Sequence, residues 1–371
     1  MLKNLLKPWM LLATLCCFFA SPLLFAAQVS NLDEALVSVA SRSLEDKNVG
    51  LREALAKVFV KNSGTESVLS HEMVIAQLQN PNALLSQFGH VEQDGQLQLK
   101  ASFDHNRVVS ILREAYLPVW GSQRPLTLMW FAFENDSERL ILNDSSALNI
   151  RRDFQAQSTN RGLPMIFPVM DLDELTQVNV ADVRGMFVDN VALASERYQA
   201  DFFAVSSVEV FAGSYQYQIS LFPRKGNEPM IQPLFSTQGN SQSLVDVAQD
   251  IVAALSEFYV TKYAIANSGS QFLSTVTFVQ NTNIQQLVDI ENYLKGLSAV
   301  KSVFLSSIAG DKAVFSLSLF GSEADFERLL TLEPRISLVT PSQDQVNSVI
   351  VVPPQTEPTS LSDSLYQWQG R

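Results

Sequence analysis

Residues 117–133 read LPVWGSQRPLTLMWFAF, and the rest of the chain is organised around this stretch. It starts where a helix is expected to end, turns through Pro118, Gly121 and Pro125, and then runs into a strand. In that strand, 126–133, all residues but one are apolar. A strand that is apolar on both faces must be covered on both sides, so we predict that it lies inside an α/β layer and starts a central domain.

The same stretch carries a resemblance to a known family. Residues 117–134, with Arg52-Glu53-Ala54-Leu55 upstream and Phe103-Asp104 before the preceding helix, resemble the proteobacterial envelope family called domain of unknown function 2066. The most specific part is the Trp-Gly…Arg-Pro element. The resemblance covers roughly residues 28–339. It implies an exported envelope protein, and the family brings no assigned activity and no catalytic residues to carry over.

The amino terminus has the pattern of a secretory signal peptide. Lysines precede an apolar run over 9–19, and two alanines follow at 26–27. The run is shorter than the about 20 residues that a membrane-spanning helix needs, and Pro22 interrupts it. We therefore predict that residues 1–26 are removed and that the mature chain is periplasmic, without a transmembrane segment. An uncleaved anchor is the alternative.

Composition narrows the classes of partner. Cleavage would leave 24 lysines and arginines against 38 acidic residues, a net charge of −14, which argues against nucleic acid as a partner. Both cysteines, Cys16 and Cys17, lie in the leader, so the mature chain would have neither a disulfide nor a thiolate. The residue before each cysteine is not small, which argues against a lipid anchor.

Residues 27–117 are predicted to form an α+β domain. Apolar residues alternate over 35–39, as in a half-buried strand, and recur at helical spacing over 51–59. Asp94-Gly95 lies between two alternating stretches and predicts a β-hairpin. Asp104 then starts a helix as its cap.

Residues 118–266 are predicted to form a central, three-layer-like α/β domain. Apolar strands at 126–133 and 163–169 are separated by a helical stretch at 147–160, which indicates parallel pairing. The order of elements resembles nucleotide-free α/β modules of bacterial envelope proteins, such as the amino-terminal domain of the Tol–Pal translocation protein. This is an analogy of fold, and it implies no function.

The remainder divides into a compact domain and a tail. Residues 271–340 show the order βαββαβ, which predicts a ferredoxin-like domain. Residues 341–371 are rich in proline, serine and glutamine, and we predict a disordered tail. Leu365, Tyr366 and Trp368 are unusual in such a tail. They are either incidental aromatic and apolar residues or a docking peptide.

Motifs for chemistry are missing from the sequence. The histidines of the mature chain, His71, His90 and His105, have no HxxH or HExxH spacing, and no cysteine remains to complete a zinc site. A GxSxG nucleophile elbow and the glycine-rich phosphate loops are also lacking. We predict no metal site and no cofactor, and we expect the histidines to be polar surface residues.

One acidic group lies where α/β folds commonly place ligands. Asp171, Asp173 and Glu174 follow the second strand of the central domain. They could hold a cation or serve acid–base chemistry. They could also be the acidic first turn of a helix, which the helix dipole favours, and we prefer this structural interpretation.

Two further candidates for a ligand or partner contact, Trp120 and Arg124, belong to the Trp-Gly…Arg-Pro element. Trp120 and Trp130 could stack on a sugar ring, but their apolar neighbours favour packing in the core. The sequence thus predicts an exported, non-enzymatic binding or assembly module of the cell envelope. Its expected partner is another envelope protein or an envelope polymer. The alternative is a hydrolase of envelope material with an acidic site near Asp171.

Overall fold

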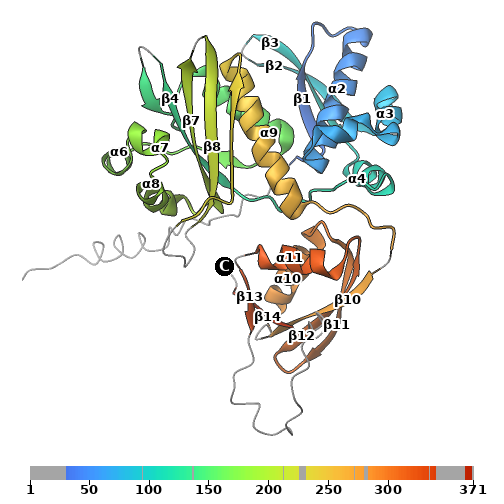
Figure 1. Ribbon diagram of the computed structural model, residues 1–371. Helices are drawn as coiled ribbons and strands as arrows, with labels where there is room; N and C mark the ends of the chain where they lie inside the picture. Colours follow the sequence, from blue (N-terminus) through green and yellow to red (C-terminus); the bar gives the residue numbers. More distant parts are fainter. Residues whose placement is uncertain are drawn as a thin grey trace, which may run out of the picture.

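Three sheets with their helices divide the computed structural model into three domains (Figure 1), which confirms the prediction of a multidomain α+β protein. The predicted signal peptide lies outside the described residues. Among the described residues, no helix combines the length and the apolar character needed to cross a membrane. The structure describes residues 31–93, 95–135, 138–211, 213–224, 231–270, 272–279, 283–333, 335–339 and 364–369.

The amino-terminal domain is an antiparallel sheet in the order β1-β3-β2, with α2 packed on one face. Helix α2 begins after Ser43, whose side chain accepts a hydrogen bond from the Asp46 amide. It ends at Gly64, where φ is 80° and a Cβ atom would lie 2.3 Å from Val260. Only glycine fits there, so α2 ends against the central domain. The elements are β1 (Glu34–Ser38), α2 (Leu44–Ser63), α3 (Glu72–Gln79), β2 (Leu85–Gln93), β3 (Gln96–Phe103) and α4 (His105–Glu114).

The central domain contains a sheet in the order β5-β4-β7-β8-β9, with β6 also paired to β4. Its strands are β4 (Thr127–Glu134), β5 (Arg139–Ile141), β6 (Met165–Ile166), β7 (Phe202–Phe211), β8 (Ser214–Pro223) and β9 (Phe235–Ser241). Its helices are α5 (Asn149–Arg161), α6 (Leu172–Gln177), α7 (Val180–Arg184), α8 (Val188–Ser195) and α9 (Leu244–Tyr263).

Strand β4 lies inside that sheet, as predicted, and every residue but the last is buried. Its side chains alternate between two cores. Met129 and Phe131 pack with residues of α5 and α9, while Leu128 and Trp130 pack with residues of α7 and α8. The sheet is therefore covered by helices on both faces.

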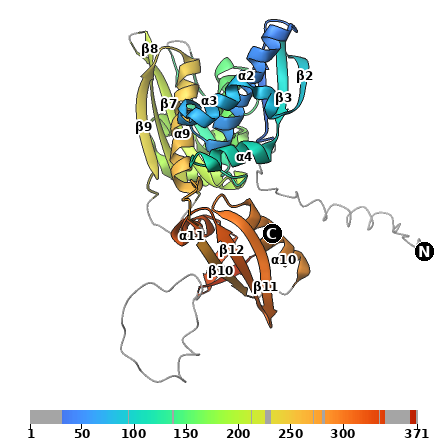
Figure 2. The same cartoon turned by 90° about the vertical axis from the view of Figure 1, so that its right-hand side faces the viewer.

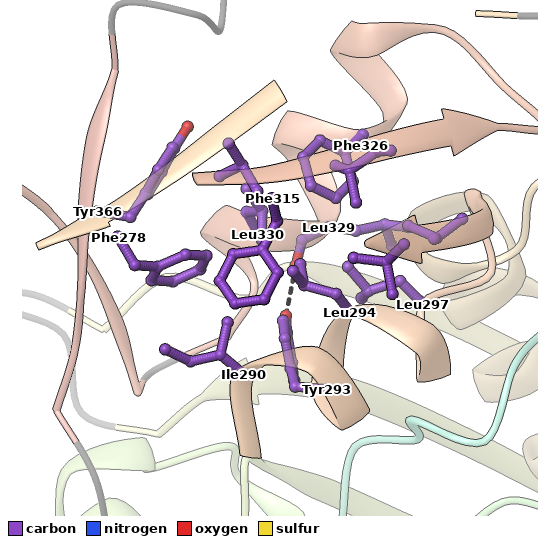
Figure 3. Packing of buried hydrophobic residues seen from close by; sticks show 14 of the residues in the cluster. Phe278, Ile290, Tyr293, Leu294, Leu297, Phe315, Phe326, Leu329, Leu330 and Tyr366 are labelled. Atoms are coloured by element: carbon purple, nitrogen blue, oxygen red, sulfur yellow. Dashed lines mark hydrogen bonds between the residues drawn. The ribbon is translucent and has the colours of Figure 1, made fainter. Parts of the chain in front are cut away.

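The carboxy-terminal domain has the element order β10 (Phe272–Val279), α10 (Ile284–Gly296), β11 (Val300–Ala309), β12 (Lys312–Leu319), α11 (Glu323–Thr331) and β13 (Ile336–Val339). A further strand, β14 (Leu365–Trp368), lies between β10 and β13, so the sheet order is β11-β12-β10-β14-β13. The prediction of a disordered tail over 341–371 is therefore wrong for these four residues. The reason is burial: Tyr366 (Figure 3) joins the core formed by α10, α11 and the sheet, and Trp368 belongs to the same core.

The carboxy-terminal domain lies on one side of the other two (Figure 1). Helix α11 contacts α9 of the central domain. Figure 2 shows α11 on the face of the carboxy-terminal sheet that is nearest to α9. The opposite face of the sheet points away from the other domains.

Candidate functional site

The predicted residues Trp120 and Arg124 come together where the amino-terminal and central domains meet. Trp120 is 1% exposed, and its ring centroid lies 6.0 Å from that of Tyr259 in α9. The guanidinium carbon of Arg124 lies 4.1 Å from the Trp120 ring centroid. Trp120 is therefore part of the core, and its faces are occupied by the protein itself.

Arg124 is buried, and all five of its N–H groups donate to backbone carbonyls. Two of the acceptors, Lys61 and Arg161, belong to the last turns of α2 and α5, where carbonyls lack partners within the helix and carry partial negative charge. The contacts are Nε to Gly121 O at 3.1 Å, Nη1 to Arg161 O and Gly162 O at 3.0 Å each, and Nη2 to Lys61 O at 2.6 Å and Trp120 O at 2.9 Å.

This arrangement fixes the charge state of Arg124. Burial lowers its pKa to about 9, which still leaves the guanidinium cationic at neutral pH. No carboxylate of the described residues forms a salt bridge with it, and helix-end carbonyls take that role. Arg124 is therefore a clamp between α2 and α5.

A second buried arginine, which sequence reasoning missed, joins the amino-terminal and carboxy-terminal domains. Arg113 of α4 donates to Ile265 O at 2.6 Å and also to the carbonyl of Ser298. Its guanidinium carbon lies 4.1 Å from the ring centroid of Phe320, and burial lowers its pKa to about 10. Nothing in the sequence distinguishes it from a solvent-exposed helix residue, because its acceptors are backbone carbonyls of distant segments.

The structure brings together two of the three predicted acids. Asp171 caps α6 by accepting the Glu174 amide at 3.1 Å, and it lies 2.8 Å from Arg197. The Glu174 amide, followed by Arg197, lowers the pKa of Asp171. Asp173 is exposed.

Glu174 itself is 1% exposed. Its carboxylate accepts the Met170 amide at 2.6 Å and the hydroxyl of Tyr198. Burial, followed by this hydrogen bond, raises the pKa of Tyr198. The carboxylate that is best sheltered in this cluster is therefore held by three neighbouring groups of the fold, since Arg197 also lies 3.5 Å away.

Another charged group lies at the carboxyl ends of the parallel strands β4 and β7. Glu134 and Glu209 are opposite each other there, beside a shallow hollow of about 330 Å³ that Arg139 and Arg184 also line. Arg184 lies 3.0 Å from Glu134 and also pairs with Glu209. The sequence signal that could have pointed to this group is its position, because Glu134 and Glu209 lie at the carboxyl ends of parallel strands, where α/β folds commonly bind ligands. Its two acids and two bases are already paired with one another.

The histidines lie in separate elements. His71 caps α3 through a hydrogen bond from the Met73 amide at 3.3 Å, His90 lies in β2, and His105 starts α4. Within the part of the chain that the structure describes, no three histidine, cysteine or acidic side chains are placed to share a metal ion.

The carboxy-terminal sheet has an open face with two exposed apolar side chains. Leu273 of β10 and Phe304 of β11 are 81% and 66% exposed. They pair with Ser318 and Ser316 of β12, which alternate with the buried residues of that strand. The face opposite α10 and α11 thus carries serines together with these two large apolar groups.

Two family models match the chain. Residues 26–121 match Domain of unknown function (DUF8605), and residues 273–368 match DUF2066. The second match confirms the predicted family for the carboxy-terminal domain, including β14. The predicted extent differs, because residues 117–134, on which the resemblance was based, lie outside 273–368.

Comparisons with whole proteins add little. No curated protein matches the chain. TolB from Acinetobacter baumannii is similar at 10% identity with a TM-score of 0.24, over 44% of this chain and 34% of that one. Formyltetrahydrofolate deformylase from Burkholderia mallei is similar at 10% identity with a TM-score of 0.17, over 52% of this chain and 94% of that one. This chain thus spans about a third of the TolB chain, and at these TM-scores neither likeness carries an argument.

Proposed function

We propose, for a chain whose residues 273–368 belong to the DUF2066 family, that it is exported to the periplasm and acts there as a non-enzymatic binding or assembly module of the cell envelope. The support for export is the leader pattern over residues 1–26. The support for a binding role comes from how the polar side chains and the exposed apolar side chains are used.

The observation that carries the proposal is the use of the most sheltered charged groups as structural clamps. Every N–H group of Arg124 donates to a backbone carbonyl at the junction between two domains. The Glu174 carboxylate accepts hydrogen bonds from a backbone amide and from the Tyr198 hydroxyl. A catalytic acid or base has to reach the substrate proton and exchange it. Arg124, together with Arg113, which bonds the carboxy-terminal domain at Ser298, instead holds the three domains as one frame, and Glu174 acts within the central domain.

A frame of this kind presents fixed surfaces. The open face of the carboxy-terminal sheet carries Phe304 at the centre of an edge strand, β11. An edge strand offers unpaired backbone groups to another strand, and exposed apolar side chains add affinity. We infer that another envelope protein or an envelope polymer contacts this face.

The test combines localisation with site-specific crosslinking in a Gram-negative host. The full chain should be released with the periplasmic fraction and should begin near Ala27. A photo-crosslinking residue at position 304 should give a discrete adduct, and the same residue at the exposed control position Asp189 should not. An uncleaved cytoplasmic product, or equal adducts at both positions, would contradict the proposal.

A further inference from the structure

Strand β14 is held by a short ladder in the middle of its sheet. It pairs in parallel with Thr277, Phe278 and Val279 of β10, and antiparallel with the four residues of β13. On the other side of β10, strand β12 pairs over eight positions. Backbone pairing thus holds β14 to β10 over fewer positions than it holds β12 to the other side of β10.

The side chains of β14 determine which sequence fits between β10 and β13. Tyr366 and Trp368 are 4% and 6% exposed and point to the core, with the Tyr366 ring beside Phe278 at 6.1 Å (Figure 3). Trp368 lies 5.4 Å from the ring of Tyr293 and 4.8 Å from the Arg335 guanidinium. Two aromatic pockets at alternate positions are what strand-addition sites use to select a peptide.

The connection to β14 is long. Twenty-five residues separate Val339 from Leu365, whereas two residues join β11 to β12. A strand on a long connection behaves as an intramolecular ligand, and a competing peptide has to overcome an effective concentration on the order of millimolar.

Without β14, the two strands on either side of it could pair with each other. Strand β14 is parallel to β10 and antiparallel to β13, so β13 runs antiparallel to β10. If β14 left, β13 would need to move by about one strand spacing, roughly 4.8 Å, to pair with β10 directly. That is the strand order of a four-stranded βαββαβ domain. Departure of β14 therefore leaves a sheet that can be completed.

We propose that the slot between β10 and β13 is a docking site for an extended peptide of a partner protein with aromatic side chains at positions i and i+2. In the free protein the chain's own residues 365–368 occupy this slot and restrain binding. The inference rests on the proposed binding role and names the chemistry of the partner.

The test uses the full chain with a protease recognition sequence introduced between residues 340 and 363. After cleavage, the domain should stay folded by circular dichroism and should release its terminal fragment on dilution. A labelled peptide of residues 361–371 should then bind, as measured by fluorescence anisotropy. The uncleaved chain should bind this peptide at least about tenfold more weakly, because the tethered strand competes.

Matched variant peptides distinguish specific binding in the slot between β10 and β13 from non-specific hydrophobic binding. A peptide with Tyr366→Ser and Trp368→Ser should not bind, whereas Gln367→Ser, on the opposite face of the strand, should change the affinity less than about threefold. Retention of the fragment until global unfolding, loss of fold on its release, or equal binding of the double-serine peptide would overturn the inference. Because Phe304 lies on the open face of the sheet, the crosslinking result there can succeed or fail independently.

Discussion

The two buried arginines lie at two domain junctions and differ in how many hydrogen bonds their guanidinium groups make. At the junction between the amino-terminal and central domains, Arg124 donates all five N–H groups to carbonyls. At the junction with the carboxy-terminal domain, Arg113 makes two such bonds and stacks on Phe320. Its Nε is buried without a hydrogen-bond partner among the described residues.

The comparison teaches what can replace a counter-ion inside a protein. Neither guanidinium has a salt-bridging carboxylate among the described residues, and both use backbone carbonyls. The Arg124 site is stronger because α2 and α5 both end there, so several carbonyls without helical partners converge on one cation. Each junction also has one serine bond, from Ser256 Oγ to Gly64 O at 2.7 Å and from Ser298 Oγ to Tyr263 O at 2.5 Å, so the difference lies in the arginines. The carboxy-terminal domain should therefore be the more loosely attached one.

Replacing Arg124 should have the largest effect. In Arg124→Met, carbonyls at the ends of α2 and α5 lose their donors in a site that water does not reach. We expect the free energy of unfolding to fall by about 4 kcal/mol, measured by urea denaturation. The control is Arg152→Met, on the exposed side of α5, which should change it by less than about 0.5 kcal/mol.

Arg124→Lys sharpens the same test. Lysine keeps the charge but has three donors on one atom, so it cannot reach carbonyls on both helices. It should recover less than half of the loss. If Arg124→Met lowers the free energy of unfolding no more than the Arg152→Met control does, the helix-end carbonyls find other hydrogen-bond donors. The assignment of Arg124 as a clamp between α2 and α5 is then wrong.

Replacing Arg113 should have the second largest effect and a different signature. Fewer hydrogen bonds are lost in Arg113→Met, so we expect a cost of about 2–3 kcal/mol. The carboxy-terminal domain should loosen selectively, with faster proteolysis of the connection at 266–270 under native conditions. The neighbouring exposed residue provides the control as Glu114→Gln. Equal proteolysis of both variants would contradict the assignment.

Lys61 tests the amino-terminal side of the Arg124 junction through pH. This side chain is 5% exposed and donates to Glu34 O at 2.6 Å. Burial, followed by the charge of Arg124, lowers its pKa from 10.5 to about 8. Between these values the unfolded chain binds more protons than the folded one, so stability rises with pH.

From pH 7 to pH 9.5 this group should add about 1–2 kcal/mol to the free energy of unfolding. The variant Lys61→Met should show a flatter dependence over the same window. The control is Lys57→Met, one turn earlier on α2, which should keep the original slope. A slope unchanged by Lys61→Met would show that this lysine is not the titrating group.

The local parts of this fold could be predicted from sequence. Strand β4 is apolar at nearly every position, the hairpin of β2 and β3 turns at Gly95 with a φ of 73°, and Ser322 forms the capping box of α11. Each is encoded within a few neighbouring residues. Strand β14 was missed because four residues are too few for a reliable alternation, and their core is supplied by segments far away in sequence.

The junctions were missed for another reason. Arg124 was identified as a candidate, but its acceptors are main-chain carbonyls, which every residue possesses and no motif marks. Arg113 was not identified at all, since a single arginine on an amphipathic helix is usually solvated. Contacts to the backbone across domains become visible only when the domains are in place.

The acidic group of the central domain gives the smallest expected effect and the clearest comparison of neighbours. Asp171 and Asp173 lie two residues apart, but only Asp171 accepts the Glu174 amide and contacts Arg197. Asp171→Ala should lower the melting temperature by about 1–3 °C, and Asp173→Ala should leave it unchanged. Because the pKa of Asp171 is lowered in the folded protein, its contribution is present above the unfolded pKa near 3.8 and is lost as the pH falls through the folded value. Full rescue of a deletion phenotype by the double variant would agree with a structural role, whereas loss of function with an unchanged melting temperature would favour the hydrolase alternative.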